Sequence, residues 1–161
     1  MVIILMGVTG SGKSTVGEAL AAILDWSFYD GDDYHPQANV DKMAQGIPLT
    51  DTDRFPWLNI LAKEIGTWLD TGKSAILASS ALKQQYRDIL LNGREEIEIV
   101  HLRGTKELIG SRLADRQHRY MPASLLTSQF DTLELPSNAL EVNIEATPEA
   151  IALEIKRRLN L

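Results

Sequence analysis

The residues best suited to chemistry lie near the amino end, in the segment Gly7-Val8-Thr9-Gly10-Ser11-Gly12-Lys13-Ser14. This segment matches G-x-x-x-x-G-K-[ST], the pattern of a phosphate-cradling loop, at every defined position. Glycine lets the backbone approach an anion without a Cβ in the way, so successive backbone N–H groups can converge on phosphate oxygens. We therefore predict that the chain binds a nucleoside triphosphate.

Two side chains at the end of this loop add specific tasks. Lys13 supplies a mobile positive charge for the β- and γ-phosphates, and the Ser14 hydroxyl is suited to ligate Mg²⁺. The predicted nucleotide-binding residues here are Gly7, Val8, Thr9, Gly10, Ser11, Gly12, Lys13, Ser14 and Thr15.

The elements that flank the loop have the pattern that this chemistry requires. The apolar run Val2–Met6 is typical of a buried parallel strand. After the loop, apolar residues recur at helical spacing as far as Leu24, which predicts a helix from about Ser14. A helix that starts at the loop also points the positive end of its dipole at the phosphates.

The rest of the chain continues to alternate strands with helices. This alternation predicts one α/β domain over residues 1–161, with a parallel sheet covered by helices on both faces. We expect strands at 26–29, 74–79, 98–102 and 139–144, and helices at 83–91, 106–116, 123–133 and from Pro148, after an N-cap at Thr147. Residues 36–70 are expected to be mainly helical, with breaks at 46–48 and at Pro56.

Composition excludes several classes of partner. The net charge of −6 argues against a nucleic acid, and no apolar run approaches the roughly 18 residues of a membrane span. The chain has no cysteine, which excludes disulfides, zinc–thiolate sites and thiol nucleophiles and is compatible with the reducing cytosol. We expect a cytoplasmic protein that binds neither nucleic acid nor membrane.

Three classes of phosphate-loop protein compete at this point. A GTPase switch should carry D-x-x-G and N-K-x-D, and the chain has neither. A motor-like ATPase should have a Mg²⁺-holding acid at the end of an apolar strand, but residues 74–79 lead into Ser80 and residues 98–102 into Arg103. The acids instead follow the second strand, as Asp30-Gly31-Asp32, which favours a small-molecule kinase.

Further motifs carry a more specific resemblance. They include Asp30-Gly31-Asp32-Asp33-Tyr34-His35-Pro36, Asn39, Lys42-Met43, Gly46-Ile47-Pro48-Leu49, and the segments 51–58, 79–88 and 128–134. In this order they resemble the gluconokinase family over nearly the whole chain. The resemblance implies a fold like that of shikimate kinase and nucleoside monophosphate kinases, with a five-stranded parallel sheet in the order 2-3-1-4-5. It also implies a helical substrate-binding insertion at about 36–70, a lid at about 116–122 and a homodimer.

The implied reaction transfers the γ-phosphoryl group of ATP, with Mg²⁺, to the 6-hydroxyl of D-gluconate. We predict that Asp32 either takes the proton of that hydroxyl, as a general base, or orients the hydroxyl. Asp30 is predicted to support Mg²⁺ through water. A D-x-D spacing at a strand end projects both side chains to one side. The alternative is a solvated acidic turn, because Asp-Gly is a common turn pair.

Cations are expected to bind the gluconate carboxylate. Arg54 and Arg87 are the predicted partners because a guanidinium fork matches a carboxylate, and Lys83 could serve the substrate or the transferring phosphoryl group. The alternative for each arginine is an ion pair with nearby surface acids. His35 could hydrogen-bond the polyol or cap the next helix.

Two further arginines lie four residues apart and so on one helix face, Arg112 and Arg116. The resemblance assigns Arg112 to stacking on adenine and Arg116 to the lid that closes over the phosphates; a plain basic helix end is the alternative. The family commonly has Arg-Lys-Gly-His-Phe at the lid. Here His118 replaces the glycine and Arg119 the histidine, so no role is assigned to Arg119.

Two other functions stay open on the sequence. One is a kinase of the same fold that acts on shikimate, another sugar acid or a nucleotide. The other is a regulatory module that binds nucleotide without transferring phosphate. A sensor needs no acceptor site, so the presence of Asp32, Lys83 and Arg87 favours an enzyme.

Overall fold

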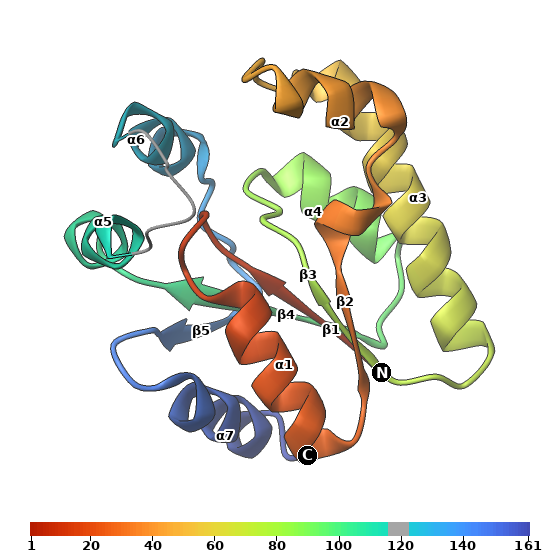
Figure 1. Cartoon of the computed structure of the whole chain (residues 1–161). Helices are drawn as coiled ribbons and strands as arrows, with labels where there is room; N and C mark the ends of the chain where they lie inside the picture. Colours follow the sequence, from red (N-terminus) through yellow and green to blue (C-terminus); the bar gives the residue numbers. More distant parts are fainter. Residues whose placement is uncertain (116–122) are drawn as a thin grey trace.

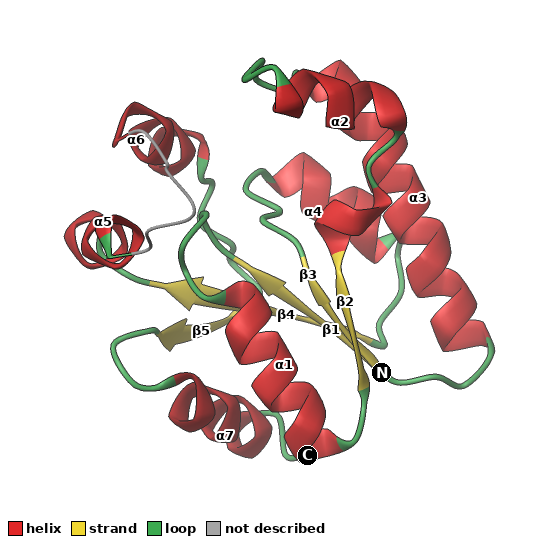
Figure 2. Ribbon diagram, in the orientation of Figure 1, coloured by secondary structure: helices red, strands yellow, loops and turns green. Residues whose placement is uncertain are grey.

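The computed structural model describes residues 1–115 and 123–161. Its centre is a five-stranded parallel sheet in the order β2-β3-β1-β4-β5, which confirms the predicted order (Figures 1 and 2). The strands are β1 Val2–Met6, β2 Ser27–Asp30, β3 Ala75–Ala78, β4 Ile97–Arg103 and β5 Leu140–Asn143.

Helices cover both faces of this sheet, as Figure 1 shows. One face packs against α1 Lys13–Leu24 and α7 Pro148–Arg158, and the other against α3 Asp51–Asp70 and α4 Gln84–Leu91. The remaining helical elements are the 3₁₀ turn η1 Gly31–Tyr34, α2 Gln37–Ala44, α5 Lys106–Ala114 and α6 Ala123–Thr132.

The central strand β1 belongs to both cores. All five of its residues are fully buried. Because side chains alternate along a strand, Ile3 and Leu5 face the α1–α7 side while Val2, Ile4 and Met6 face the α3–α4 side. Burial on both faces explains why this segment is apolar without interruption.

Helix α3 runs unbroken through Pro56, which corrects the expected break at this residue. The proline removes one intrahelical hydrogen bond, to the carbonyl of Thr52, but Thr52 is exposed and its carbonyl can be solvated. A capping box between Thr50 and Asp53 fixes the start of the helix. Burial of its apolar face, with Trp57 among the buried residues, outweighs the lost bond.

The other boundaries differ from the prediction by one or two residues. Strand β2 starts at Ser27 and includes Asp30 as its last residue. Helix α7 begins as predicted, with the Thr147 hydroxyl accepting from the backbone N–H of Ala150 at 3.2 Å and Pro148 in the first turn. The predicted lid at 116–122 lies outside the described residues. Within those that are described, no helix is both long and apolar enough to cross a bilayer.

Candidate functional site

The carboxyl ends of β1, β2 and β3 meet at one edge of the sheet. Asp30 at the end of β2 is in register with Ala78 at the end of β3. The Gly7 N–H donates to the Ser80 carbonyl at 3.2 Å, so the phosphate loop leaves the sheet beside the segment that follows β3. The phosphate loop and the Asp30–Asp32 turn therefore open at the same edge (Figure 1).

Backbone conformation makes the phosphate loop. Gly10 and Gly12 have φ values of +86° and +92°, in the left-handed region that favours glycine. A Cβ at Gly10 would also lie 2.8 Å from the Cγ of Leu113. Gly12 is the N-cap of α1 and has no side chain that could cap the helix. The first backbone N–H groups of α1 are therefore available to bind a phosphate.

Lys13 connects this loop to the acidic turn. Its Nζ donates to the carbonyls of Gly7 at 3.0 Å and Val8 at 3.1 Å. Burial lowers the pKa of the Lys13 ammonium to about 8, and the negative charges of Asp32 and Asp30 partly oppose this shift. Both carboxylates therefore act on the lysine that is predicted to bind the γ-phosphate.

Ser14 and Asp30 lie next to each other. The Ser14 hydroxyl donates to Asp30 Oδ2 at 3.3 Å, and Asp30 Oδ1 accepts from the Asp32 N–H at 2.9 Å. Mg²⁺ prefers oxygen ligands and usually takes most of them from phosphates and water, so one hydroxyl beside one carboxylate suits it. Among the residues that the structure describes, no group of three or more His, Cys, Asp or Glu side chains could hold a metal by itself.

Asp32 projects from the acidic turn with 81% of its side chain exposed, and its Oδ1 lies 3.7 Å from His35 Nε2. The His35 ring is only 4% exposed and stacks on Trp57 at 4.2 Å between centroids. Trp57 Nε1 in turn donates to the Gly31 carbonyl at 2.7 Å. Through Trp57, helix α3 thus contacts both Gly31 and His35 and stabilises the turn that carries Asp32.

Two of the predicted substrate cations come together around a tyrosine. Lys83 Nζ lies 3.1 Å from Asp51 Oδ2, and the Tyr86 hydroxyl donates to Asp51 Oδ1. Arg54 Nη1 donates to the Tyr86 hydroxyl at 3.3 Å. The alternative for Arg54 is an ion pair with a nearby acid. Of the two acids that precede it, Asp53 pairs with Lys42 at 2.8 Å, whereas the charge of Arg54 helps to lower the pKa of Asp51.

This group of charges is electrostatically coupled. The hydrogen bond from Tyr86, followed by that from Lys83, lowers the pKa of the Asp51 carboxyl. The hydrogen bond between Lys83 and Asp51 also raises the pKa of Lys83, so this side chain is a cation at neutral pH. Burial first, and then the bond to Asp51, raises the pKa of Tyr86.

Arg87 is not part of this group of charges. It is a buried residue, only 1% exposed. Its guanidinium donates to the carbonyls of Ala81 at 2.8 Å, Leu82 at 3.1 Å and Glu134 at 2.7 Å, and to Gln84 Oε1 at 3.1 Å. Ala81 has a left-handed φ of +45°, so Arg87 holds a strained turn in place. This geometry gives no support to the expected contact with a substrate carboxylate, and we leave Arg87 out of the site.

On the nucleotide side, the Arg112 guanidinium donates to the Ile144 carbonyl and so joins α5 to the segment after β5. Arg116 lies outside the described residues, as do His118 and Arg119.

Sequence reasoning assigned no role to several residues that organise the site. Gln129 of α6 makes two bonds to Thr9: its Oε1 accepts from the Thr9 N–H at 2.7 Å and its Nε2 donates to the Thr9 hydroxyl at 2.9 Å. Sequence reasoning likewise assigned no role to Asn39, Asp51 or Tyr86. All four lie inside the family motifs, but their residue types alone do not reveal which atoms they contact.

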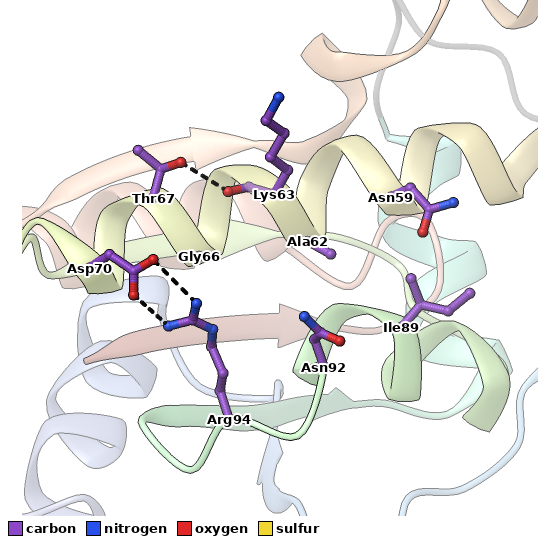
Figure 3. A pocket seen from close by; sticks show the side chains of 9 residues that line it. All are labelled: Asn59, Ala62, Lys63, Gly66, Thr67, Asp70, Ile89, Asn92 and Arg94. Carbon is purple, nitrogen blue, oxygen red and sulfur yellow. Dashed lines mark hydrogen bonds and ion pairs between the residues drawn. The ribbon is translucent and has the colours of Figure 1, made fainter.

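Two hollows of the described surface lie apart from most of these residues. A groove of about 540 Å³ between α3 and α4 is lined by Asn59, Ala62, Lys63, Gly66, Thr67, Asp70, Ile89, Asn92 and Arg94 (Figure 3). Arg94 and Asp70 form an ion pair at 2.9 Å in this groove, and none of the predicted site residues lines it. A second hollow of about 430 Å³ includes Val8 of the phosphate loop.

Known proteins resemble this chain along most of its length. The family model described as "AAA domain" matches residues 2–136. "Probable gluconokinase" of Rattus norvegicus is 42% identical, over 98% of this chain and 97% of its own length. "Thermosensitive gluconokinase" of Escherichia coli strain K12 is 47% identical over 83% of this chain and 71% of its own.

Solved structures agree with these relatives. A gluconokinase from Sinorhizobium meliloti 1021 superposes with a TM-score of 0.84 at 40% identity, over 98% of this chain and 91% of that one. Shikimate kinase from Aquifex aeolicus, at 19% identity and a TM-score of 0.56, shares the fold alone.

Proposed function

The chain belongs to the gluconokinase family and carries an AAA domain, and from this premise we propose that it transfers the γ-phosphoryl group of ATP to the 6-hydroxyl of D-gluconate. The products are 6-phospho-D-gluconate and ADP. The observation that carries the proposal is the shared edge of the phosphate loop and the acidic turn, where the charge of Asp32 acts on Lys13.

On the donor side, residues 7–15 bind the triphosphate through backbone N–H groups and the Lys13 ammonium. To reach the γ-phosphate, Lys13 exchanges its bonds to the Gly7 and Val8 carbonyls for phosphate oxygens. Arg112 contacts the adenine, and Arg116 closes over the phosphates. Ser14 and Asp30 would hold Mg²⁺, which supplies charge neutralisation on the phosphates when it is bound.

On the acceptor side, Asp32 orients the 6-hydroxyl and takes its proton as the phosphoryl group arrives. Gluconate is an open chain with its carboxylate at the opposite end. Arg54 and Lys83 bind that carboxylate, and His35 borders the polyol. Phosphoryl transfer depends mainly on such positioning and on charge neutralisation.

Assembly and location belong to the same proposal. The family resemblance supports a homodimer, and the use of ATP as phosphoryl donor supports a cytoplasmic location.

A coupled ADP-release assay tests the proposal directly. With ATP and Mg²⁺ present, D-gluconate should give turnover well above glucose, shikimate and AMP at equal concentrations. Equal or faster turnover of one of those three acceptors would overturn the assignment of the substrate. A rate of ADP release that is the same with and without each acceptor would overturn the assignment as a kinase.

A further inference from the structure

The side-chain amide of Asn39 fixes the protonation pattern of a neighbouring ring. Asn39 is 3% exposed, and its Nδ2 donates to the Asp53 carbonyl at 2.9 Å. The same Nδ2 lies 3.2 Å from His35 Nδ1. A backbone carbonyl can only accept, so the amide must present its NH₂ group, and not its oxygen, to Asp53.

The tautomer of His35 follows from this arrangement. One hydrogen of the Asn39 amide goes to the Asp53 carbonyl, and the second points to His35 Nδ1. Nδ1 must therefore be the acceptor nitrogen of the neutral ring. The ring proton then resides on Nε2, the nitrogen that lies 3.7 Å from Asp32 Oδ1.

The ring has little freedom to escape this orientation. It is 4% exposed, and it stacks on Trp57 with the two planes inclined by 18°. Trp57 is itself tied to the Gly31 carbonyl, one residue before Asp32. Hydrogen bonds at active sites are often long before the substrate binds and shorten in the complex, which is the behaviour expected of the 3.7 Å separation.

We propose that His35 is a positioning residue for Asp32, with its Nε2–H directed at the carboxylate by the Asn39 amide. The relay Asp53–Asn39–His35–Asp32 ties the start of α3, which carries Arg54, to the group that meets the acceptor hydroxyl. The inference rests on the proposed function for the role of Asp32, but the tautomer can be tested without any substrate.

Nitrogen NMR of the full chain labelled with ¹⁵N-histidine measures the tautomer. The sequence contains three histidines, so the His101→Asn and His118→Asn variants assign the His35 signals by elimination. We expect an unprotonated Nδ1 and a protonated Nε2 for His35 in the absence of ligand. A proton on Nδ1 would overturn the proposal, whatever the enzyme's substrate is.

Two matched substitutions test the positioning role. His35→Gln can place an amide donor near the former Nε2, whereas the shorter His35→Asn reaches only the Nδ1 side; both remove the stack on Trp57 equally. With gluconate, His35→Asn should lower kcat by on the order of 100-fold, as misplacement of a reacting group does, with a much smaller change in KM. His35→Gln should retain most of kcat.

Equal losses of kcat in the two variants, with both folded by circular dichroism, would contradict the positioning role. So would a loss confined to the gluconate KM. If the wild-type protein did not phosphorylate gluconate at all, the proposed function would fail, while the NMR result would still decide the tautomer.

Discussion

The donor side of the site takes its shape from nine consecutive residues, 7–15, whereas the acceptor side draws on η1, α2, α3 and α4, spread between residues 31 and 91. The donor side works mainly through backbone N–H groups and glycine conformation. The acceptor side works through side chains held by other side chains, as in the Asp51, Tyr86 and Lys83 group.

This difference predicts how each side responds to substitution. A backbone loop positions ligands largely by itself, so the Lys13 side chain can be removed without disturbing the fold. On the acceptor side, a substitution disturbs either a ligand contact or a contact that supports one. The following substitutions separate these cases, from the largest expected effect to the smallest.

Lys13→Ala should lower kcat by about 100- to 1000-fold, because a preorganised charge on the transferring group is lost. The circular dichroism spectrum should not change, since within residues 1–115 and 123–161 the Lys13 ammonium donates to two loop carbonyls, which other loop contacts can hold in place. Lys63→Ala, at an exposed position of α3, is the matched control and should have wild-type kcat. Activity in Lys13→Ala within a few-fold of wild type would contradict the assignment of the loop.

Arg87→Ala should lower the free energy of unfolding by about 3 kcal/mol, measured by urea denaturation. The substitution leaves two buried carbonyls and one partly buried carbonyl without their charged donor. A wild-type unfolding curve together with a strongly raised gluconate KM would instead return Arg87 to the substrate site.

Arg54→Ala should raise the KM for gluconate by about 10- to 100-fold, the range expected for the loss of a charge-assisted hydrogen bond, with little change in the KM for ATP. Arg54→Lys should recover only part of the affinity, because the ammonium lacks the planar fork. Arg94→Ala, which removes the ion pair with Asp70, serves as the control. An effect of Arg54→Ala on ATP alone would show that the carboxylate binds elsewhere.

Asp53→Asn should have the smallest effect, and one that depends on pH. The hydrogen bond from Lys42, then those at Thr50, lower the pKa of Asp53 to about 2 from an ordinary 3.8. The folded state therefore gains stability from the ionised carboxylate above pH 3.8 and loses it as the pH falls towards 2. The difference in Tm between wild type and Asp53→Asn should be constant near pH 6 and shrink between pH 4 and 2. A difference that does not vary with pH would exclude this contribution.

The same contrast explains how far the sequence predicts the molecule. The strand order was given only by the family resemblance and is confirmed, whereas the strands, helices and phosphate loop follow from local pattern: apolar runs, helical spacing and glycines in a fixed order. The predicted helix break at Pro56 was wrong because burial of one face of α3 is a tertiary effect, and it outweighs the low helix propensity of proline.

The acceptor side is harder to predict because residue type does not determine what a side chain touches. Arg54 and Arg87 look equivalent in the sequence, yet Arg54 reaches Tyr86 and Arg87 is buried against backbone carbonyls. Asn39 gives no signal of its own, and its role follows only from two acceptors that lie 4 and 14 residues away.

A crystal structure with gluconate and a non-hydrolysable ATP analogue would test most directly whether donor and acceptor meet between the phosphate loop and the acidic turn. We expect the 6-hydroxyl within about 2.6–3.2 Å of the Asp32 carboxylate and in line with the γ-phosphate, with Lys13 moved from its loop carbonyls to the phosphate. Gluconate bound elsewhere, for example in the α3–α4 groove with Asp32 directed away from the nucleotide, would contradict the account.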